Sequence, residues 1–309
     1  MKACIDIGGT KVAVSLNSGT DLDLDLVARR SEPTAKTGSN DALALQVRRM
    51  VDEACAKAGV APAVVQRAGV SSCGPFVMRA GLIEVAAPNI CGGIAGPARG
   101  LPNDWETALL EAPLRERFHE VRVENDCVAA LEAERRWGAL LGINHCAYVT
   151  WSTGIGTGLC VDGHVLRGKN GNAGHAGHMF VSDNDDALCG CGNVGDVEAL
   201  IAGNAIGRRF GADAATLLSR ARSGDVASLA VVDELCRVMG RTLYNMIITL
   251  DLQRICLGGS VFWHHREFLL PRLAGQVRGK LGALTDGCDL VAAGLEDRVG
   301  DYAALALLV

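Results

Sequence analysis

The sequence contains no block of Lys and Arg residues, no apolar run of membrane-spanning length and no basic-then-apolar pattern at its N-terminus. The formal net charge of its 309 residues is −5. This charge argues against nucleic acid or an anionic membrane surface as the main partner. The 12 cysteines do not follow the spacing of a small disulfide-rich domain. Such usage is typical of a reducing compartment, so we expect a cytoplasmic protein.

The chain also lacks a short repeat, a low-complexity segment and a linker between its halves. Its conspicuous component is glycine, with 38 residues gathered in short clusters. Glycine clusters mark turns at which the backbone approaches another group closely. The length is sufficient for two domains with sizeable cores.

The two halves of the chain show the same order of predicted elements. Three strand-like runs open the first half, at residues 2–8, 11–17 and 22–28, and the pattern restarts after Asn144. Alternating helices and strands follow in both halves, among them a helix near 103–117 in the first. The sequence therefore predicts a duplicated α/β architecture.

This pattern predicts two domains that pack across a cleft. The first is a smaller α/β domain at residues 1–120, and the second is a larger α/β domain at 121–296. A C-terminal helix at about 297–309 is expected to pack back on the first domain.

Each half contains a glycine-rich turn after a strand. The turns read DIGGT at residues 6–10 and STGIGTG at residues 152–158. A Gly-Gly hairpin explains the first turn alone, with Gly8 and Gly9 supplying positive φ angles. Amides of such a turn also bind phosphate, with Asp6 nearby to handle a metal ion. The matched pair favours the second explanation, in which both turns face a cleft and hold a polyphosphate.

Six motifs resemble those of one known family in order and spacing. They are DIGGTK, VENDCVAALEAE, STGIGTG, GNAGHAGH, CGCGNVGDVEA and CLGGS, and the chain resembles the ROK-family sugar kinases over nearly its whole length. The resemblance implies an actin-like, hexokinase-like fold of two ribonuclease-H-like domains around a cleft, in which ATP and a sugar meet. It also implies a homodimer, in line with the general preference for two-fold symmetry. The family includes repressors with an added helix-turn-helix, for which the residues before Asp6 leave no room.

The motif VRVEND, at residues 121–126, ends a strand and begins a helix. Taken alone, Asn125 and Asp126 are explained as helix N-cap residues. By resemblance, Asp126 is the catalytic base that accepts the proton of the sugar 6-hydroxyl, and Asn125 hydrogen-bonds sugar hydroxyls. One aligned carboxylate suffices there, because phosphoryl transfer needs mainly positioning and charge neutralisation.

The resemblance also implies which residues hold ATP and Mg²⁺. Asp6 is expected to orient a water of the Mg²⁺ shell, because this ion keeps most of its waters. The other residues implied in nucleotide binding are Gly8, Gly9, Thr10, Lys11, Thr153, Gly154, Gly258 and Gly259. An ordinary strand-to-helix turn is an alternative explanation for Gly258 and Gly259.

Besides Asn125, four residues are candidates for sugar contact. Asn89, in AAPN, resembles a sugar-binding asparagine, although a surface turn explains it equally. His175 stands where most family members have a Glu that contacts hydroxyls near C1 and C2. A neutral imidazole donates and accepts whereas a carboxylate only accepts, so this change predicts altered specificity unless His175 merely packs against the loop. Glu198 matches the remaining sugar-contacting carboxylate, and His178 is expected to touch the sugar and order its loop.

His178, Cys189 and Cys191 follow the family's zinc pattern, in which one His and three Cys form a tetrahedral structural site. Asp196 stands where the third cysteine is expected. Because carboxylate oxygen also binds Zn²⁺, we predict a His/Cys/Cys/Asp site of lower affinity.

These inferences predict an ATP- and Mg²⁺-dependent hexose 6-kinase. N-acetylmannosamine is slightly favoured over glucose because of His175. One alternative is a sugar-binding or regulatory protein that has lost catalysis, which the departures at His175 and Asp196 would suit. The retained Asp6 and Asp126 argue against it, because a pure binder needs neither a base nor a metal-orienting carboxylate. A kinase that uses polyphosphate or another phosphoryl donor is a third alternative.

Overall fold

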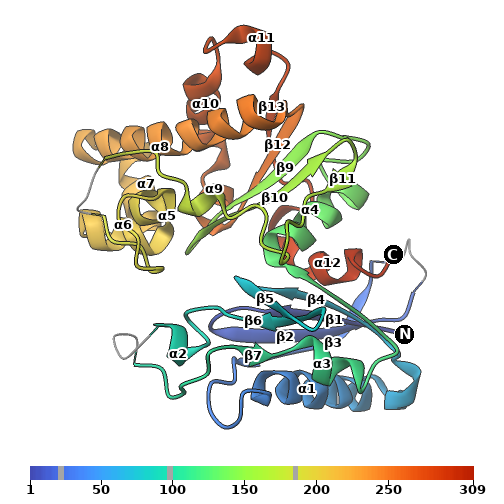
Figure 1. Ribbon diagram of the computed structural model, residues 1–309. Coiled ribbons are helices and arrows are strands. Elements are labelled where there is room, and N and C mark those ends of the chain that lie inside the picture. The colour runs from blue at the N-terminus through green and yellow to red at the C-terminus, as the bar shows by residue number, and fades with distance from the viewer. Residues whose placement is uncertain (20–23, 96–99, 184–186) are drawn as a thin grey trace. The chain divides into compact units, whose positions relative to one another are not determined.

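The computed structural model describes residues 1–19, 24–95, 100–183 and 187–309, and it divides the chain into two compact units (Figure 1). Unit 1 comprises Met1–Ala133, Arg167–Ala173 and Arg298–Val309, and unit 2 comprises Glu134–Leu166 and Gly174–Asp297. Each unit encloses a hydrophobic core of its own. In the described part of the chain, none of the helices has both the length and the apolar character that a membrane crossing needs.

The central sheet of unit 1 has five strands in the order β3-β2-β1-β4-β8. Strands β1, β4 and β8 run parallel, whereas β2 runs antiparallel to both of its neighbours, β1 and β3. Their bounds are β1 (Lys2–Ile7), β2 (Lys11–Asn17), β3 (Leu26–Pro33), β4 (Arg67–Ser72) and β8 (Glu120–Asn125). Strands β1 and β4 are buried along almost their whole length, as is typical of strands covered on both faces.

Helices cover both faces of this sheet because side chains alternate along each strand. Ala68 and Val70 of β4 belong to the core that α1 (Ala42–Ala58) completes. Gly69 points to the other face, where α12 (Val299–Ala306) approaches so closely that a Cβ on Gly69 would lie 2.0 Å from the Ala304 carbonyl oxygen. The remaining elements of unit 1 are η1 (Pro62–Val64), β5 (Phe76–Arg79), β6 (Leu82–Val85), α2 (Gly92–Ala95), β7 (Ala108–Leu109) and α3 (Glu111–Arg115).

Unit 2 repeats this design with a sheet in the order β11-β10-β9-β12-β13. Strands β9, β12 and β13 run parallel, and β10 runs antiparallel to both β9 and β11. The strands are β9 (Cys146–Trp151), β10 (Ile155–Val161), β11 (His164–Val165), β12 (Arg254–Gly258) and β13 (Asp289–Ala292). The two sheets thus share one strand order and one set of directions, which confirms the predicted duplicated α/β fold.

Most helices of unit 2 lie between β11 and β13 in sequence. They are η3 (Ala176–His178), α5 (Val197–Ile201), α6 (Gly203–Phe210), α7 (Ala214–Arg222), α8 (Val226–Leu250), α9 (Ser260–Trp263), α10 (Arg266–Val277) and α11 (Gly282–Thr285). Two elements straddle a unit boundary, namely α4 (Asp126–Trp137) and η4 (Glu296–Arg298). The cleft and the domain boundary at residue 120 stay predictions.

Two local predictions were wrong. The third strand was placed at 22–28 but occupies Leu26–Pro33, and positions 22 and 23 lie outside the described residues. The helix expected near 103–117 shrinks to α3, because the Asn103 side chain engages backbone instead of solvent. Its Oδ1 accepts from Gly92 N at 2.8 Å and its Nδ2 donates to the Ile90 carbonyl at 2.9 Å, which holds this stretch as a loop.

Candidate functional site

Three parallel strands of unit 1 end together at one edge of the sheet. The register pairs Ile7 of β1 with Ser72 of β4, and Ser72 with Asn125 of β8. Since polar groups at the carboxyl ends of parallel strands gather at one edge, Asp6 and Asp126 come close enough to interact. Burial, reinforced by the negative charge of Asp126, raises the pKa of Asp6 to about 6.

Asp126 is exposed at the first turn of α4, directly after β8. The preceding Asn125 is buried, and its Oδ1 accepts from Cys127 N at 3.0 Å, which is an N-cap hydrogen bond. Oδ1 of Asp126 accepts from the same N–H at 2.8 Å. The N-cap explanation therefore holds for Asn125, and the cap fixes the helix end that presents the Asp126 carboxylate.

The raised pKa of Asp6 predicts a stability gain in Asp6→Asn that depends on pH. Because the pKa in the folded state lies above that in the unfolded state, the folded protein disfavours the ionised carboxylate, and this penalty grows as pH rises from about 4 to about 6. At pH 8, Asp6→Asn is expected to increase the free energy of unfolding by about 1–2 kcal/mol, and at pH 4 by much less. Urea denaturation at the two pH values measures the difference, and an equal change at both would contradict the prediction.

The first glycine turn, Gly8–Thr10, joins β1 to β2. Gly8 N donates to the Lys11 carbonyl at 2.8 Å, and Thr34 N donates to the Thr10 carbonyl at 3.1 Å. Oγ1 of Thr34 also donates to the Gly8 carbonyl at 2.7 Å. Within the described residues, the N–H groups of Gly9 and Thr10 donate to no protein group. These two adjacent amides are therefore available to an anion.

The hairpin explanation of this turn, in which Gly8 and Gly9 supply positive φ angles, was wrong. Neither Gly8 nor Gly9 has a positive φ. Gly9 instead allows a close approach, because a Cβ there would lie 1.9 Å from Nδ2 of Asn89 and that side chain would have to move. The exposed Asn89, a candidate sugar-binding residue, thus lies against the turn.

The second turn, between β9 and β10 of unit 2, has the same property. Ser152 N donates to the Gly154 carbonyl at 3.0 Å, and Gly203 N donates to the Ser152 carbonyl at 2.8 Å. In the part of the chain that is described, Thr153 N and Gly154 N donate to no protein group. Each unit therefore offers one glycine turn with two adjacent open amides.

Gly258 ends β12 beside the end of β9, and Gly259 follows as the N-cap residue of α9. A Cβ on Gly258 would lie 2.4 Å from the Tyr148 hydroxyl, and one on Gly259 would lie 2.5 Å from the Trp151 carbonyl oxygen. Gly259 also has φ +87°, in the region that favours glycine. This strand-to-helix turn accounts for both glycines structurally, and their contact with a nucleotide stays a prediction.

A loop of unit 2 delivers two cysteines to one place. Cys189 N donates to the Asn193 carbonyl at 2.7 Å, and Cys191 N points at Sγ of Cys189 at 3.5 Å. Gly192 and Gly195 permit this tight path with φ angles of +99° and +79°.

Four side chains converge beside this loop. Nδ1 of His178, Sγ of Cys189 and of Cys191, and a carboxylate oxygen of Asp196 all lie within 4.8 Å of one another. Nδ1 lies 3.0 Å from Asp196 Oδ2 and 3.8 Å from Cys189 Sγ, and Cys191 Sγ lies 3.6 Å from Oδ2. Zinc bonds of about 2.0–2.3 Å at tetrahedral angles would place such atoms about 3.3–3.8 Å apart. The donor set and its spacing are consistent with a zinc site.

Asp196 has two tasks in this cluster. Its Oδ1 accepts from Ala199 N at 2.7 Å and caps α5, while Oδ2 faces His178. Although burial opposes ionisation, the hydrogen bonds from His178 and Ala199 hold the pKa of Asp196 below its ordinary value. The Asp196 hydrogen bond in turn raises the pKa of His178.

The remaining sugar candidates of unit 2 lie close to this cluster. The rings of His175 and His178 stack with their centroids 6.2 Å apart. Glu198, in the first turn of α5, accepts from Ile155 N with its Oε2 at 3.0 Å. The structure thus brings these three residues together in unit 2, and their contact with sugar stays a prediction.

Sequence reasoning missed Asn172, which pairs with the backbone of Phe76 in both directions. Oδ1 accepts from Phe76 N at 2.7 Å and Nδ2 donates to the Phe76 carbonyl at 2.8 Å. The glycines and small residues around Asn172 indicated a functional loop. No sequence pattern near Asn172 identified Phe76 as its partner.

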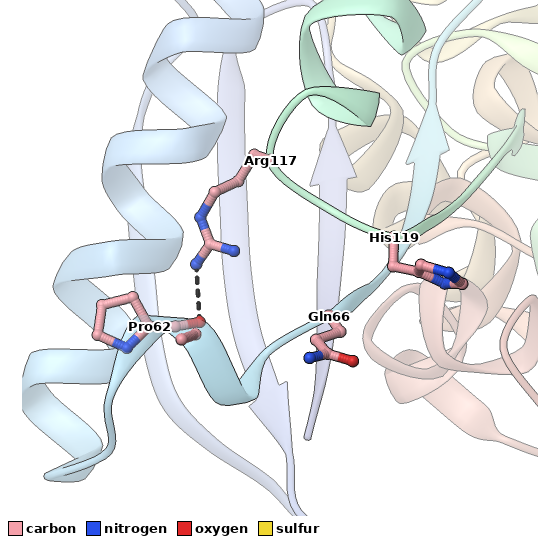
Figure 2. A pocket seen from close by; sticks show the side chains of 5 residues that line it. Pro62, Gln66, Arg117 and His119 are labelled. Atoms are coloured by element: carbon pink, nitrogen blue, oxygen red, sulfur yellow. Dashed lines mark hydrogen bonds between the residues drawn. The ribbon is translucent and has the colours of Figure 1, made fainter.

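Unit 1 has a surface pocket of about 510 Å³ (Figure 2). It is lined by Pro62, Ala63, Gln66, Arg117 and His119. Gln66 and His119 directly precede β4 and β8, so the pocket lies at the opposite end of these strands from Asp6 and Asp126. The Arg117 guanidinium is already engaged by the Pro62 and Val65 carbonyls.

Two five-stranded units, each with an open glycine turn, define an α/β protein of the hexokinase-like, actin-fold class. The chain belongs to the ROK family, whose sequence model matches residues 2–308. The N-acetylmannosamine kinase of Citrobacter koseri is 32% identical over 268 residues, which cover 83% of this chain and 82% of that protein. The predicted resemblance to ROK-family sugar kinases is thereby confirmed.

Solved structures show the same fold. The ROK hexokinase of Thermus thermophilus superposes with a TM-score of 0.77 at 29% identity, over 98% of this chain and 96% of that one. A ROK-family glucokinase of Streptomyces griseus, crystallised with glucose and AMPPNP, gives a TM-score of 0.68 at 24% identity, over 98% and 97% of the two chains.

Proposed function

We propose that this chain is a kinase that transfers the γ-phosphoryl group of ATP to the 6-hydroxyl of a hexose. The observation that carries the proposal is the pair of equivalent turns, each with two adjacent open amides, because backbone amides of glycine turns bind phosphate. The names of the relatives, N-acetylmannosamine kinase and hexokinase, support the same activity.

Unit 1 is proposed to supply the nucleophile side of the reaction. Asp126 is exposed and held on a capped helix end, so it is accessible to accept the proton of the sugar hydroxyl. Asp6 has a pKa of about 6 and is mostly ionised at pH 7.5, as a partner of Mg²⁺ and its waters must be. Gly8, Gly9, Thr10 and Lys11 are proposed to meet the phosphates.

Unit 2 is proposed to supply the remaining phosphate and sugar contacts. Thr153 and Gly154 offer their open amides to phosphate. Gly258 and Gly259 are proposed to let the adenosine approach the backbone. On the sugar side, His175, His178 and Glu198 join Asn89 and Asn125 of unit 1 as proposed contacts.

N-acetylmannosamine is the proposed substrate, ahead of glucose. The imidazole of His175 can both donate and accept a hydrogen bond, which suits an N-acetyl group as well as a hydroxyl. The test is a panel of hexoses and N-acetylhexosamines with coupled detection of ADP, and with polyphosphate as an alternative donor. N-acetylmannosamine should give the highest kcat/KM. A higher kcat/KM with glucose would overturn the assignment of N-acetylmannosamine as the substrate. ATP turnover that no sugar stimulates would overturn the proposed kinase activity.

His178, Cys189, Cys191 and Asp196 are proposed to hold one structural zinc ion per chain, which would cross-link the loop to α5. After washing with a weak chelator, metal analysis is expected to find close to one zinc per chain. Asp196→Asn should lower the zinc content strongly, because an amide is a poorer ligand, while its Oδ1 still caps α5.

The matched control for the zinc prediction is Asp213→Asn. Asp213 caps α7 through Thr216 N at 2.9 Å in the same way, but it is not part of the cluster. Its zinc content should equal that of the wild type. A wild-type protein with only a trace of zinc would end the proposal.

A further inference from the structure

The Glu198 carboxylate touches the phosphate turn of unit 2 directly. Its Oε2 accepts from Ile155 N at 3.0 Å, and a Cβ on Gly154 would lie 2.7 Å from this same oxygen. The other oxygen, Oε1, faces Sγ of Cys189 at 3.9 Å. Both oxygens of the carboxylate are therefore engaged within unit 2.

The helix that carries Glu198 is itself fixed to the strand before the turn. Trp151, the last residue of β9, is fully buried and donates from its indole Nε1 to the Ile201 carbonyl at 2.7 Å. At the other end of α5, the Asp196 side chain provides the N-cap. The carboxylate of Glu198 is thus held by a short helix with both ends tied down.

These contacts determine which amides of the turn remain open. Gly203 N donates a hydrogen bond to the Ser152 carbonyl, and Ile155 N donates one to the Glu198 carboxylate. The turn is therefore held on both sides. Only the amides between these two points, those of Thr153 and Gly154, are left to meet an anion among the described groups of the turn.

We infer that Glu198 is a positioning residue for the nucleotide, acting through Ile155 N to hold the amides of Thr153 and Gly154 in place. This inference rests on the proposed kinase function and goes beyond the sugar contact expected of Glu198. A methyl group on Gly154 would displace the carboxylate from the turn. Loss of the carboxylate would leave Ile155 N without its partner and free the turn to move.

The test is the affinity for a non-hydrolysable ATP analogue with Mg²⁺, measured by calorimetry without sugar. Glu198→Ala is expected to weaken analogue binding about 3- to 10-fold, the effect of one lost hydrogen bond. Glu198→Gln keeps a carbonyl oxygen for Ile155 N and should stay within about twofold of the wild type. The matched control, Glu267→Ala, removes an exposed glutamate of α10 and should change nothing.

A double-variant cycle isolates the contact. Gly154→Ala should weaken analogue binding by itself, but should add little to Glu198→Ala, because the clash needs the carboxylate. Zinc content and thermal unfolding of each variant show whether the cluster and the fold are intact. If Glu198→Ala does not fold, Glu198→Gln and Gly154→Ala carry the test.

The outcomes separate this inference from the proposed function. If Glu198→Ala binds the analogue as tightly as the wild type but has a raised KM for sugar, Glu198 only contacts the sugar. That result would overturn the inference. Effects of Gly154→Ala and Glu198→Ala that simply multiply would overturn it as well. Failure of the wild type to bind the analogue would instead overturn the proposed function.

Discussion

Asp126→Asn is expected to lower kcat by about 10²–10⁴-fold, the usual contribution of a general base. The amide keeps the shape of the side chain but cannot accept the proton of the sugar hydroxyl. Because Asn125 provides the cap of α4, the helix end should remain in place. Steady-state kinetics with saturating sugar and ATP measures the effect, and the KM for ATP should change by less than about threefold.

The control for this prediction is Asp213→Asn, which alters a helix-capping aspartate of α7 outside the site. It should keep wild-type kcat. The same substitution at Asp126 should also lower the pKa of Asp6, because it removes a neighbouring negative charge. Turnover of Asp126→Asn close to that of the wild type would exclude Asp126 as the base.

The largest effect on stability is expected from Glu134→Ala. Glu134, in α4, is 0% exposed, and its carboxylate accepts from three backbone amides. They are Ala139 N at 2.7 Å, Gly294 N at 2.9 Å and Leu295 N at 3.0 Å. Without the carboxylate these three N–H groups have no acceptor, and each unsatisfied donor costs about 1–3 kcal/mol of stability. We therefore expect the free energy of unfolding to fall by about 3–6 kcal/mol.

Glu132→Ala is the matched control, since Glu132 lies one half-turn away in the same helix and is partly exposed. Its ion pair with Arg167, at 3.6 Å, should contribute no more than about 1 kcal/mol. Glu134→Gln, which keeps one acceptor oxygen, should fall between the two. Urea denaturation of the three variants gives the comparison, and a loss below about 1 kcal/mol in Glu134→Ala would mean that water replaces the carboxylate.

The duplicated fold was predictable because it depends on local patterns. The strands predicted at 2–8 and 11–17 are short runs rich in apolar residues, and such runs are recognisable within a few consecutive residues. The errors arose where a distant contact overrides such a pattern. Asn103 resembles an ordinary polar residue in a helical stretch, yet its side chain binds Ile90 and Gly92, and this favours a loop.

The candidate site was predictable only in part. The motifs located Asp6, Asp126 and the two turns, because their residue types follow the ends of predicted strands. The close approach of Asn89 to Gly9 was not predictable, because Asn89 lies 80 positions further along the chain.

The sequence by itself determined the order of the elements, the position of each glycine turn and the set of metal-ligating side chains, because these depend on residue type and short-range spacing. Only the tertiary structure decided which backbone amides of the turns remain open, which side chain lies against Gly9, and that Glu134 and Glu198 accept hydrogen bonds from backbone amides. Hydrogen-bond partners far apart in the chain are set by packing, and no local pattern encodes them.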